Sequence, residues 1–233
     1  MLTISGLNSF YGRAHILFDL ALEANKGEVV VLLGRNGAGK STTMKSIIGL
    51  VQPASGSIAF EGKAIDRMSP YRIARAGLGY VPEERRIFTD LSVMENLEVG
   101  RQPSREGAPT WTPERLFELF PNLGRMKDRP GGRMSGGEQQ MLTIARTLMG
   151  NPRLILLDEP SEGLAPVIVE QMANTIRELK REGLAVLLSE QNLHFSEMVA
   201  DRAYIVEKGR IRYSGAMNDL MRDTEVRAAF LQV

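Results

Sequence analysis

The sequence of 233 residues predicts an α/β fold with a mainly parallel core sheet, an N-terminal antiparallel β-subdomain and an inserted helical subdomain. Two observations carry this prediction. Short continuous apolar runs alternate with helical patterns, which is typical of buried parallel strands joined by crossover helices. The first 60 residues instead contain short strands separated by turn residues, which favour antiparallel pairing.

Three apolar runs predict the core strands: Val29–Leu33, Leu154–Leu157 and Ala185–Leu188. Each run is bounded by polar or glycine-rich segments, as expected for a strand buried on both faces. A helical pattern follows the first run at 41–50. Another, at 172–179, lies between the second and third runs, where a right-handed crossover belongs.

The antiparallel parts of the chain are predicted from short strands and turn signals. Segments 1–7, 14–22 and 57–60 are expected to form the N-terminal sheet. Near the C-terminus, 204–206 and 211–213 flank Lys208-Gly209, which indicates a hairpin. Residues 218–230 are expected to form one terminal helix.

The chain is expected to be a single domain over 1–233. Residues 1–90 and 151–233 would form the core with its β-subdomain, and about 91–150 the helical subdomain, with a surface loop around 102–110. The chain lacks cysteine, which excludes disulfides and thiolate metal sites. Neither a signal peptide nor an apolar run long enough to span a bilayer is predicted. The net charge of +1 gives no electrostatic reason to expect nucleic acid as a partner.

A glycine-rich loop follows the first core strand. It reads Gly34-Arg35-Asn36-Gly37-Ala38-Gly39-Lys40-Ser41, with Thr42 next, and fits the pattern G-x-x-x-x-G-K-[ST]. Glycines let successive backbone N–H groups face one anion, and the helix that begins there adds the positive end of its dipole. Lys40 would contact the β- and γ-phosphates, and the Ser41 hydroxyl would bind Mg²⁺. The strand, loop and helix together predict an ATP-binding site.

Two carboxylates end the second core strand. Asp158 and Glu159 follow Leu157 directly, and adjacent acids emerging from a buried strand need a cation nearby. Mg²⁺ is the expected cation. Asp158 would hold it directly or through water, and Glu159 would orient or deprotonate the attacking water.

A second glycine-containing helix start lies at Ser135-Gly136-Gly137-Glu138. Ser135 and Glu138 have the spacing of a capping box. The residues themselves support two interpretations equally: a second phosphate-binding helix N-terminus, or a well-capped core helix.

Taken together, these motifs resemble those of the ABC ATPase family over nearly the whole chain. The family places S-G-G-[EQ]-Q between a phosphate loop and L-L-D-E-P, as this sequence does. The resemblance implies that Ser135, Gly136, Gly137 and Glu138 close over the ATP held by a second subunit. It also implies that Tyr11 stacks on adenine and that the loop 161–164 crosses the dimer interface.

Two positions depart from the general family pattern. Glu83 stands where a glutamine usually senses Mg²⁺ and the permease, and its carboxylate can still meet Mg²⁺ through water. Gln191 stands where a histidine usually contacts the γ-phosphate. A glutamine can hydrogen-bond to phosphate but cannot carry a proton near neutral pH, so we expect Gln191 to position it.

These departures, with the motifs V-P-E, S-G-G-E-Q-Q-M-L, D-E-P-S-E-G-L-A-P and S-E-Q-N, resemble the LivF-type subunits of branched-chain amino acid importers. Urea and amide importers use similar subunits, and S-E-G after the acid pair resembles the urea type. The resemblance implies a second ATPase subunit (LivG-like, or a second copy), two transmembrane permease subunits and, indirectly, an extracytoplasmic solute-binding protein. The chain would lie peripherally on the cytoplasmic face of the inner membrane.

Several alternatives remain open from the sequence. Soluble ABC ATPases that act on ribosomes or DNA usually carry two cassettes or a basic insertion, which this chain lacks. A non-catalytic partner subunit is favoured by Gln191 and opposed by Lys40, Asp158 and Glu159. Only the family resemblance opposes an exporter motor. Segment 85–88 is either an exposed turn with an apolar foot or a socket for a permease helix.

Overall fold

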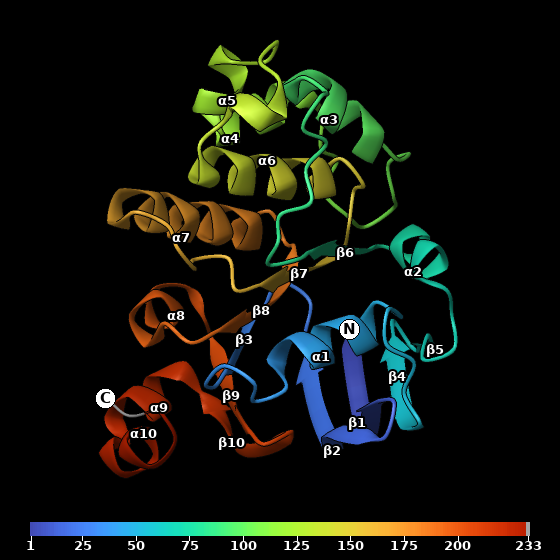
Figure 1. The fold of residues 1–233 in the computed structure, drawn as a ribbon, viewed down its shortest axis with the longest axis vertical. Coiled ribbons are helices and arrows are strands. Elements are labelled where there is room, and N and C mark those ends of the chain that lie inside the picture. Colours follow the sequence, from blue (N-terminus) through green and yellow to red (C-terminus); the bar gives the residue numbers. More distant parts are fainter. Residues whose placement is uncertain (232–233) are drawn as a thin grey trace.

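A parallel sheet lies at the centre of the computed structural model, which describes residues 1–231 (Figure 1). Its six strands run in the order β10-β9-β3-β8-β7-β6. The strands are β3 (Val29–Leu33), β6 (Leu78–Val81), β7 (Leu154–Asp158), β8 (Ala185–Glu190), β9 (Arg202–Glu207) and β10 (Arg210–Ala216). Only β10 is antiparallel to its neighbour. The predicted α/β fold class is therefore confirmed.

A second, antiparallel sheet forms from the N-terminal segments in the order β2-β1-β4-β5. Its strands are β1 (Leu2–Tyr11), β2 (Ala14–Ala24), β4 (Ser55–Phe60) and β5 (Lys63–Ala64). The pairing of β1 with β2 is interrupted by register shifts after Ile4, Leu7 and Ser9. These irregularities bend the strand pair, as bulges do.

The alternation of side chains along the parallel strands divides the core into two layers. In β3, Val29, Val31 and Leu33 face one hydrophobic cluster, while Val30 and Leu32 face the other. The first cluster is covered mainly by helices and the second by α1 (Lys40–Ile47) and the antiparallel sheet. Burial on both faces explains why the sequence of this strand is continuously apolar.

The helices follow the predicted pattern in most places. They are α1 (Lys40–Ile47), α2 (Pro70–Ala76), α3 (Val93–Gly100), α4 (Pro113–Leu119), α5 (Pro121–Arg125), α6 (Gly136–Leu148), α7 (Pro166–Arg181), α8 (Leu193–Val199), α9 (Met217–Arg222) and α10 (Thr224–Phe230), with a 3-10 turn at Gly131–Arg133. Helices α3 to α6 gather above α7 at the top of Figure 1.

Two predicted helices differ from the structure, and one strand was missed. The terminal helix expected over 218–230 is broken at Asp223, whose carboxylate caps α10 by accepting the Val226 N–H at 2.9 Å. The helix expected to reach residue 50 ends at Ile47, because Gly49 adopts a positive φ of 77°. Strand β6 was not predicted, since its sequence, L-G-Y-V, is short and contains glycine.

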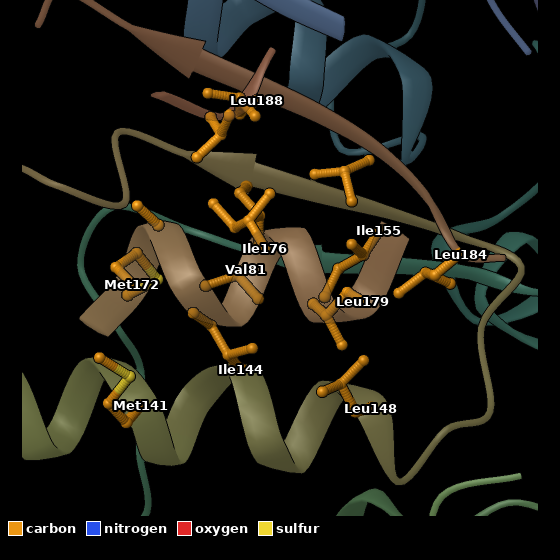
Figure 2. Close-up of a cluster of buried hydrophobic side chains, with 14 of the residues drawn as sticks. Val81, Met141, Ile144, Leu148, Ile155, Met172, Ile176, Leu179, Leu184 and Leu188 are labelled. Atoms are coloured by element: carbon orange, nitrogen blue, oxygen red, sulfur yellow. The ribbon is translucent and has the colours of Figure 1, made fainter. Parts of the chain in front are cut away.

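Helix α6 packs against strand β6 and against α7. Figure 2 shows Met141, Ile144 and Leu148 of α6 pointing toward α7, and Ile155 and Leu188 of the sheet on the far side of α7. Ile176 is completely buried. This apolar layer fixes the start of α6 relative to the ends of the parallel strands.

We expect Ile176→Ala to lower the free energy of unfolding by about 2–5 kcal/mol, because it leaves a cavity between α6, α7 and the sheet. Denaturant unfolding followed by circular dichroism measures the change. Val167→Ala on the same helix, at a position 59% exposed, serves as the control. A loss below about 1 kcal/mol for Ile176→Ala would show that this layer does not anchor α7.

Candidate nucleotide-binding site

The loop between β3 and α1 has an open, anion-accepting shape. Gly37 and Gly39 have positive φ values of 76° and 112°, a region that side chains disfavour. Gly39 is the N-cap of α1 and has no side chain to cap it, so the first N–H groups of the helix remain available. Arg35 and Asn36 are exposed at the rim, whereas Ala38 and Thr42 are buried.

The turn between β9 and β10 supports this loop from below. The N–H of Gly209 donates to the carbonyl of Ala38 at 2.8 Å, and the N–H of Phe18 donates to the carbonyl of Gly209 at 2.9 Å. The β9–β10 hairpin is therefore hydrogen-bonded both to the glycine-rich loop and to β2.

Lys40 is buried at the centre of the loop, with 3% of its surface exposed. Its ammonium donates to the carbonyls of Gly34 at 2.7 Å and Arg35 at 3.1 Å, and lies 2.9 Å from Oε1 of Glu159. These three partners match the three N–H donors of a lysine. The sequence predicted that Mg²⁺ would neutralise the acid pair, but in this structure Lys40 neutralises Glu159.

Asp158 accepts three side-chain hydrogen bonds. Its Oδ1 accepts from the hydroxyls of Ser41 at 3.0 Å and Ser189 at 2.6 Å, and its Oδ2 accepts from Tyr80 at 3.2 Å. Burial, together with the charge of Asp158, raises the pKa of the Tyr80 phenol well above its usual range. Tyr80 therefore stays a neutral donor to Asp158, whose other oxygen lies beside the Ser41 hydroxyl.

Glu159 has a strained backbone and an unsatisfied oxygen. Its φ is 50°, in the left-handed region, and its N–H donates to the carbonyl and hydroxyl of Ser189 at 3.1 and 3.2 Å. Its Oε2 is buried without a hydrogen-bond partner among residues 1–231. A buried carboxylate oxygen of this kind is an acceptor for a water or another donor that enters the site.

Glu83 lies in a group of carboxylates. Burial, followed by the negative charges of Glu162, Asp158, Glu159 and Glu84, raises its pKa above the usual range. A divalent cation would relieve this repulsion, so the acids and the Ser41 hydroxyl fit Mg²⁺. Within the described chain, no three His, Cys, Asp or Glu side chains are placed to hold a metal by themselves, so phosphate oxygens or water must supply further ligands.

Two further predicted residues, Gln191 and Tyr11, are exposed. Gln191 follows β8 and is exposed. Tyr11 ends β1 with 48% of its surface exposed, close in sequence to Phe10, which stacks on His15 with ring centroids 4.0 Å apart. His15 lies between Phe10 and Phe18.

Segment 135–138 begins α6 with the predicted capping box. The Glu138 N–H donates to the Ser135 hydroxyl, and the Ser135 N–H donates to the Glu138 carboxylate. No hydrogen bond within residues 1–231 joins this segment to the glycine-rich loop. A side chain at Gly137 would press on Ile168, and one at Gly136 on the guanidinium of Arg85.

Three residues beside the acid pair were missed from the sequence: Tyr80, Ser189 and Glu190. Ser189 lies opposite Asp158 in the parallel register of β7 and β8, and Tyr80 lies opposite Leu156 in β6 and β7. The apolar runs 154–157 and 185–188 have the same length. Pairing them in parallel with their ends aligned would have placed Ser189 beside Asp158. Without a predicted β6, nothing in the sequence indicated Tyr80.

The fold and this site define a P-loop nucleotide-binding protein. The model of the ABC transporter family matches residues 17–162, more than half of the chain. The chain therefore belongs to the ABC transporter family, as its ATP-binding subunit, and is an ATPase of that class.

Similar proteins cover almost the whole chain. It is 43% identical over 231 residues to the high-affinity branched-chain amino acid transport ATP-binding protein BraG of Pseudomonas aeruginosa, covering 99% of both chains. It is 36% identical over 233 residues to the lipopolysaccharide export system ATP-binding protein LptB of Haemophilus influenzae, covering 99% of this chain and 97% of that one. The crystal structure of an ATP-binding cassette of an ABC transporter, MJ1267, in its ADP conformation has a TM-score of 0.82 and 28% identity, covering 97% and 96%. The predicted family is confirmed.

None of the helices in the described part of the chain is long and apolar enough to cross a membrane.

We expect Lys40→Ala to lower the unfolding free energy of the nucleotide-free protein by about 3–5 kcal/mol, because it leaves the Glu159 carboxylate buried without a cation. Replacing Glu159 by Gln in the same chain removes that charge, so Lys40→Ala/Glu159→Gln should regain most of the loss. A double-mutant cycle measured by urea unfolding gives the coupling. Purely additive effects would mean that the pair does not stabilise the nucleotide-free site.

Proposed function

We propose that this chain is the ATP-hydrolysing motor of an importer for branched-chain amino acids or related amino acids and amides. The observation that carries the proposal is the convergence of the glycine-rich loop, Asp158 and Glu159 at one edge of the sheet, in a chain 43% identical to BraG. The motor would work peripherally on the cytoplasmic face of the inner membrane.

ATP phosphates would bind in the loop from Gly34 to Ser41, with Thr42 in the first helical turn. Lys40 would exchange its contact with Glu159 for a phosphate oxygen, since a phosphate carries more negative charge than one carboxylate. Tyr11 would stack on the adenine ring. Mg²⁺ would be held by Ser41 and Asp158, with Glu83 through water, and would neutralise charge on the phosphates.

Release of Glu159 from Lys40 would prepare the hydrolytic step. The freed carboxylate would accept a proton from the attacking water and align it on the γ-phosphate. The buried Oε2, which lacks a partner, provides an acceptor for that water. Gln191, at the exposed end of β8, would hydrogen-bond to the γ-phosphate without transferring a proton.

Segment 135–138 would act on the nucleotide of a second subunit. It lacks hydrogen bonds to its own glycine-rich loop in the described structure, while the capped start of α6 is suited to phosphate. We infer a head-to-tail dimer with a LivG-like ATPase or a second copy, closed by two ATP molecules. Loop 161–164 would lie between the subunits.

Glu159→Gln is expected to keep ATP binding and to lower turnover by about 10²–10⁴-fold, because the amide cannot accept the proton of water. Phosphate release and a fluorescent ATP analogue measure the two quantities. Glu170→Gln on α7, an exposed position, is the control. Wild-type turnover in Glu159→Gln would remove this residue from the mechanism.

A groove of about 670 Å³ beside the site is suited to a permease. Four of the seven exposed large hydrophobic side chains in residues 1–231 line it: Leu50, Tyr71, Phe88 and Val99. Such a cluster on an otherwise polar surface indicates a protein interface. An apolar segment of a permease cytoplasmic loop is the proposed occupant.

The groove is connected to α6 through segment 85–88. The carbonyl of Arg85 accepts from Thr143 at 2.9 Å, and the carbonyl of Arg86 accepts from Arg146 at 2.7 Å. The Arg146 guanidinium also lies 5.1 Å from the centre of the Phe88 ring. Because α6 begins with segment 135–138, movement of a docked permease would be transmitted to that segment. Of the two sequence interpretations of 85–88, this favours the socket.

We expect Tyr71→Asp to reduce recovery of permease subunits with the tagged chain at least about tenfold, because it places a charge in the apolar groove. Co-purification from native membranes in mild detergent measures it. Val167→Asp changes an equally exposed hydrophobic residue outside the groove and should leave recovery unchanged. Equal recovery with Tyr71→Asp would contradict permease docking here.

The same purification of the unmutated chain, with bound proteins identified by mass spectrometry, tests the proposed function as a whole. Two multi-spanning permeases and a second ATPase are expected, together with genetic linkage to a solute-binding protein for amino acids or amides. Ribosomal or nucleoid proteins, or no membrane partner, would contradict a transport function.

A second candidate is favoured by the similarity to LptB. At 36% identity over nearly the whole chain, a motor for export of lipopolysaccharide is the alternative to import. The co-purified permeases distinguish the two, since an exporter would lack a linked solute-binding protein.

A further inference from the structure

Glu190 is a buried acid that the mechanism above does not use. It is the last residue of β8 and is 1% exposed. None of the ion pairs within residues 1–231 includes it. Burying a carboxylate without a cation is unfavourable, so this position requires another explanation.

Its two oxygens accept from two different loops. Oε1 accepts the N–H of Ser161 at 3.0 Å, and Oε2 accepts the N–H of Asn192 at 3.3 Å. Ser161 lies two residues after Glu159, and Asn192 lies one residue after Gln191. A single carboxylate therefore joins the segment that carries the expected general base to the segment expected to contact the γ-phosphate.

The same segments are fixed on their other sides. The Glu159 N–H donates to the carbonyl and hydroxyl of Ser189, and Asn192 caps α8 by accepting the Phe195 N–H at 3.1 Å. Between these anchors, Glu190 is the side chain that spans both loops. Its contacts are therefore suited to setting the position of Glu159 relative to Gln191.

The surroundings of Glu190 raise its pKa. Burial raises the pKa of Glu190 to about 7, against the hydrogen bonds from Ser161 and Asn192, which lower it, and with the charge of Glu159, which raises it. Glu159 is in turn paired with Lys40. The neighbouring titratable side chains of α8 and of the loop after β7, His194, Glu197 and Glu162, are exposed.

We propose that Glu190 is a positioning residue that couples the loop after Glu159 to the segment of Gln191, so that both meet the nucleotide in one arrangement. The inference rests on the proposed ATPase mechanism of this site. The ionised carboxylate is a strong acceptor on each oxygen. A proton on one oxygen makes that oxygen a weaker acceptor and loosens its contact with one loop.

The test compares steady-state ATP hydrolysis by wild type and Glu190→Gln between pH 6 and 8. The amide accepts through its oxygen alone, so one loop is released at every pH. We expect wild-type kcat to fall below pH 7, and the Glu190→Gln kcat to be about tenfold lower at pH 8 and flat across the range. KM for ATP should stay within about twofold, because the glycine-rich loop is untouched.

Thermal unfolding separates positioning from simple structural support. The raised pKa means that Glu190 favours the folded state most at low pH and progressively less as pH rises through about 7. Removing the charge should therefore leave the Tm of Glu190→Gln at pH 8 equal to or above that of wild type. A lowered Tm with a wild-type pH profile of kcat would assign a structural role and overturn the proposal.

Two further variants complete the experiment. Glu190→Asp, which is too short to reach both loops, should lose kcat and the fall in kcat below pH 7, and it replaces the glutamine variant if that one does not fold. Glu197→Gln on α8 is the exposed control and should match wild type.

Two outcomes are distinguishable. If the wild type hydrolyses ATP normally and Glu190→Gln has the same kcat and pH profile as the wild type, this inference alone is overturned. Absence of hydrolysis in the wild type would instead contradict the proposed function.

Discussion

The buried ion pair between Lys40 and Glu159 is the interaction on which the rest of the site depends. Both side chains are about 95% buried or more, and neither could remain charged there without the other. The pair fills the glycine-rich loop and holds the expected general base against it. In the proposed mechanism a phosphate competes for the same ammonium, so nucleotide binding would also release Glu159 from Lys40.

The parallel sheet makes this exchange possible by bringing three strand ends together. The loop after β3 supplies Lys40, the end of β7 supplies Asp158 and Glu159, and the end of β8 supplies Ser189 and Glu190. Parallel strands end at one edge, where ligand sites of α/β proteins lie. The apolar layer between α6 and α7 then sets where segment 135–138 stands, and segment 85–88 links α6 to the hydrophobic groove. If a permease docks in the groove as proposed, segment 85–88 and α6 would connect it to segment 135–138.

Much of this arrangement follows from the sequence, and the exceptions have physical reasons. The three apolar runs became β3, β7 and β8 because strands buried on both faces leave a strong pattern. Strand β6 left none, since L-G-Y-V is too short to show a period. The glycine-rich loop and acid pair were recognisable from local spacing. The Lys40–Glu159 contact and the bridging by Glu190 join segments far apart in the chain, and their geometry depends on strand register, which no local pattern records. The roles of Tyr11, Glu83, Gln191 and segment 135–138 stay predictions.

A structure of the protein with Mg²⁺ and a non-hydrolysable ATP analogue tests the central claim most directly, through the distance between Lys40 Nζ and the Glu159 carboxylate. In the structure described here this distance is 2.9 Å. The account predicts that it exceeds about 4 Å, the limit of an ion pair, with Nζ on a phosphate oxygen and Glu159 facing the γ-phosphate. A pair that stays closed while the nucleotide is bound would contradict the exchange and leave Glu159 without access to the attacking water.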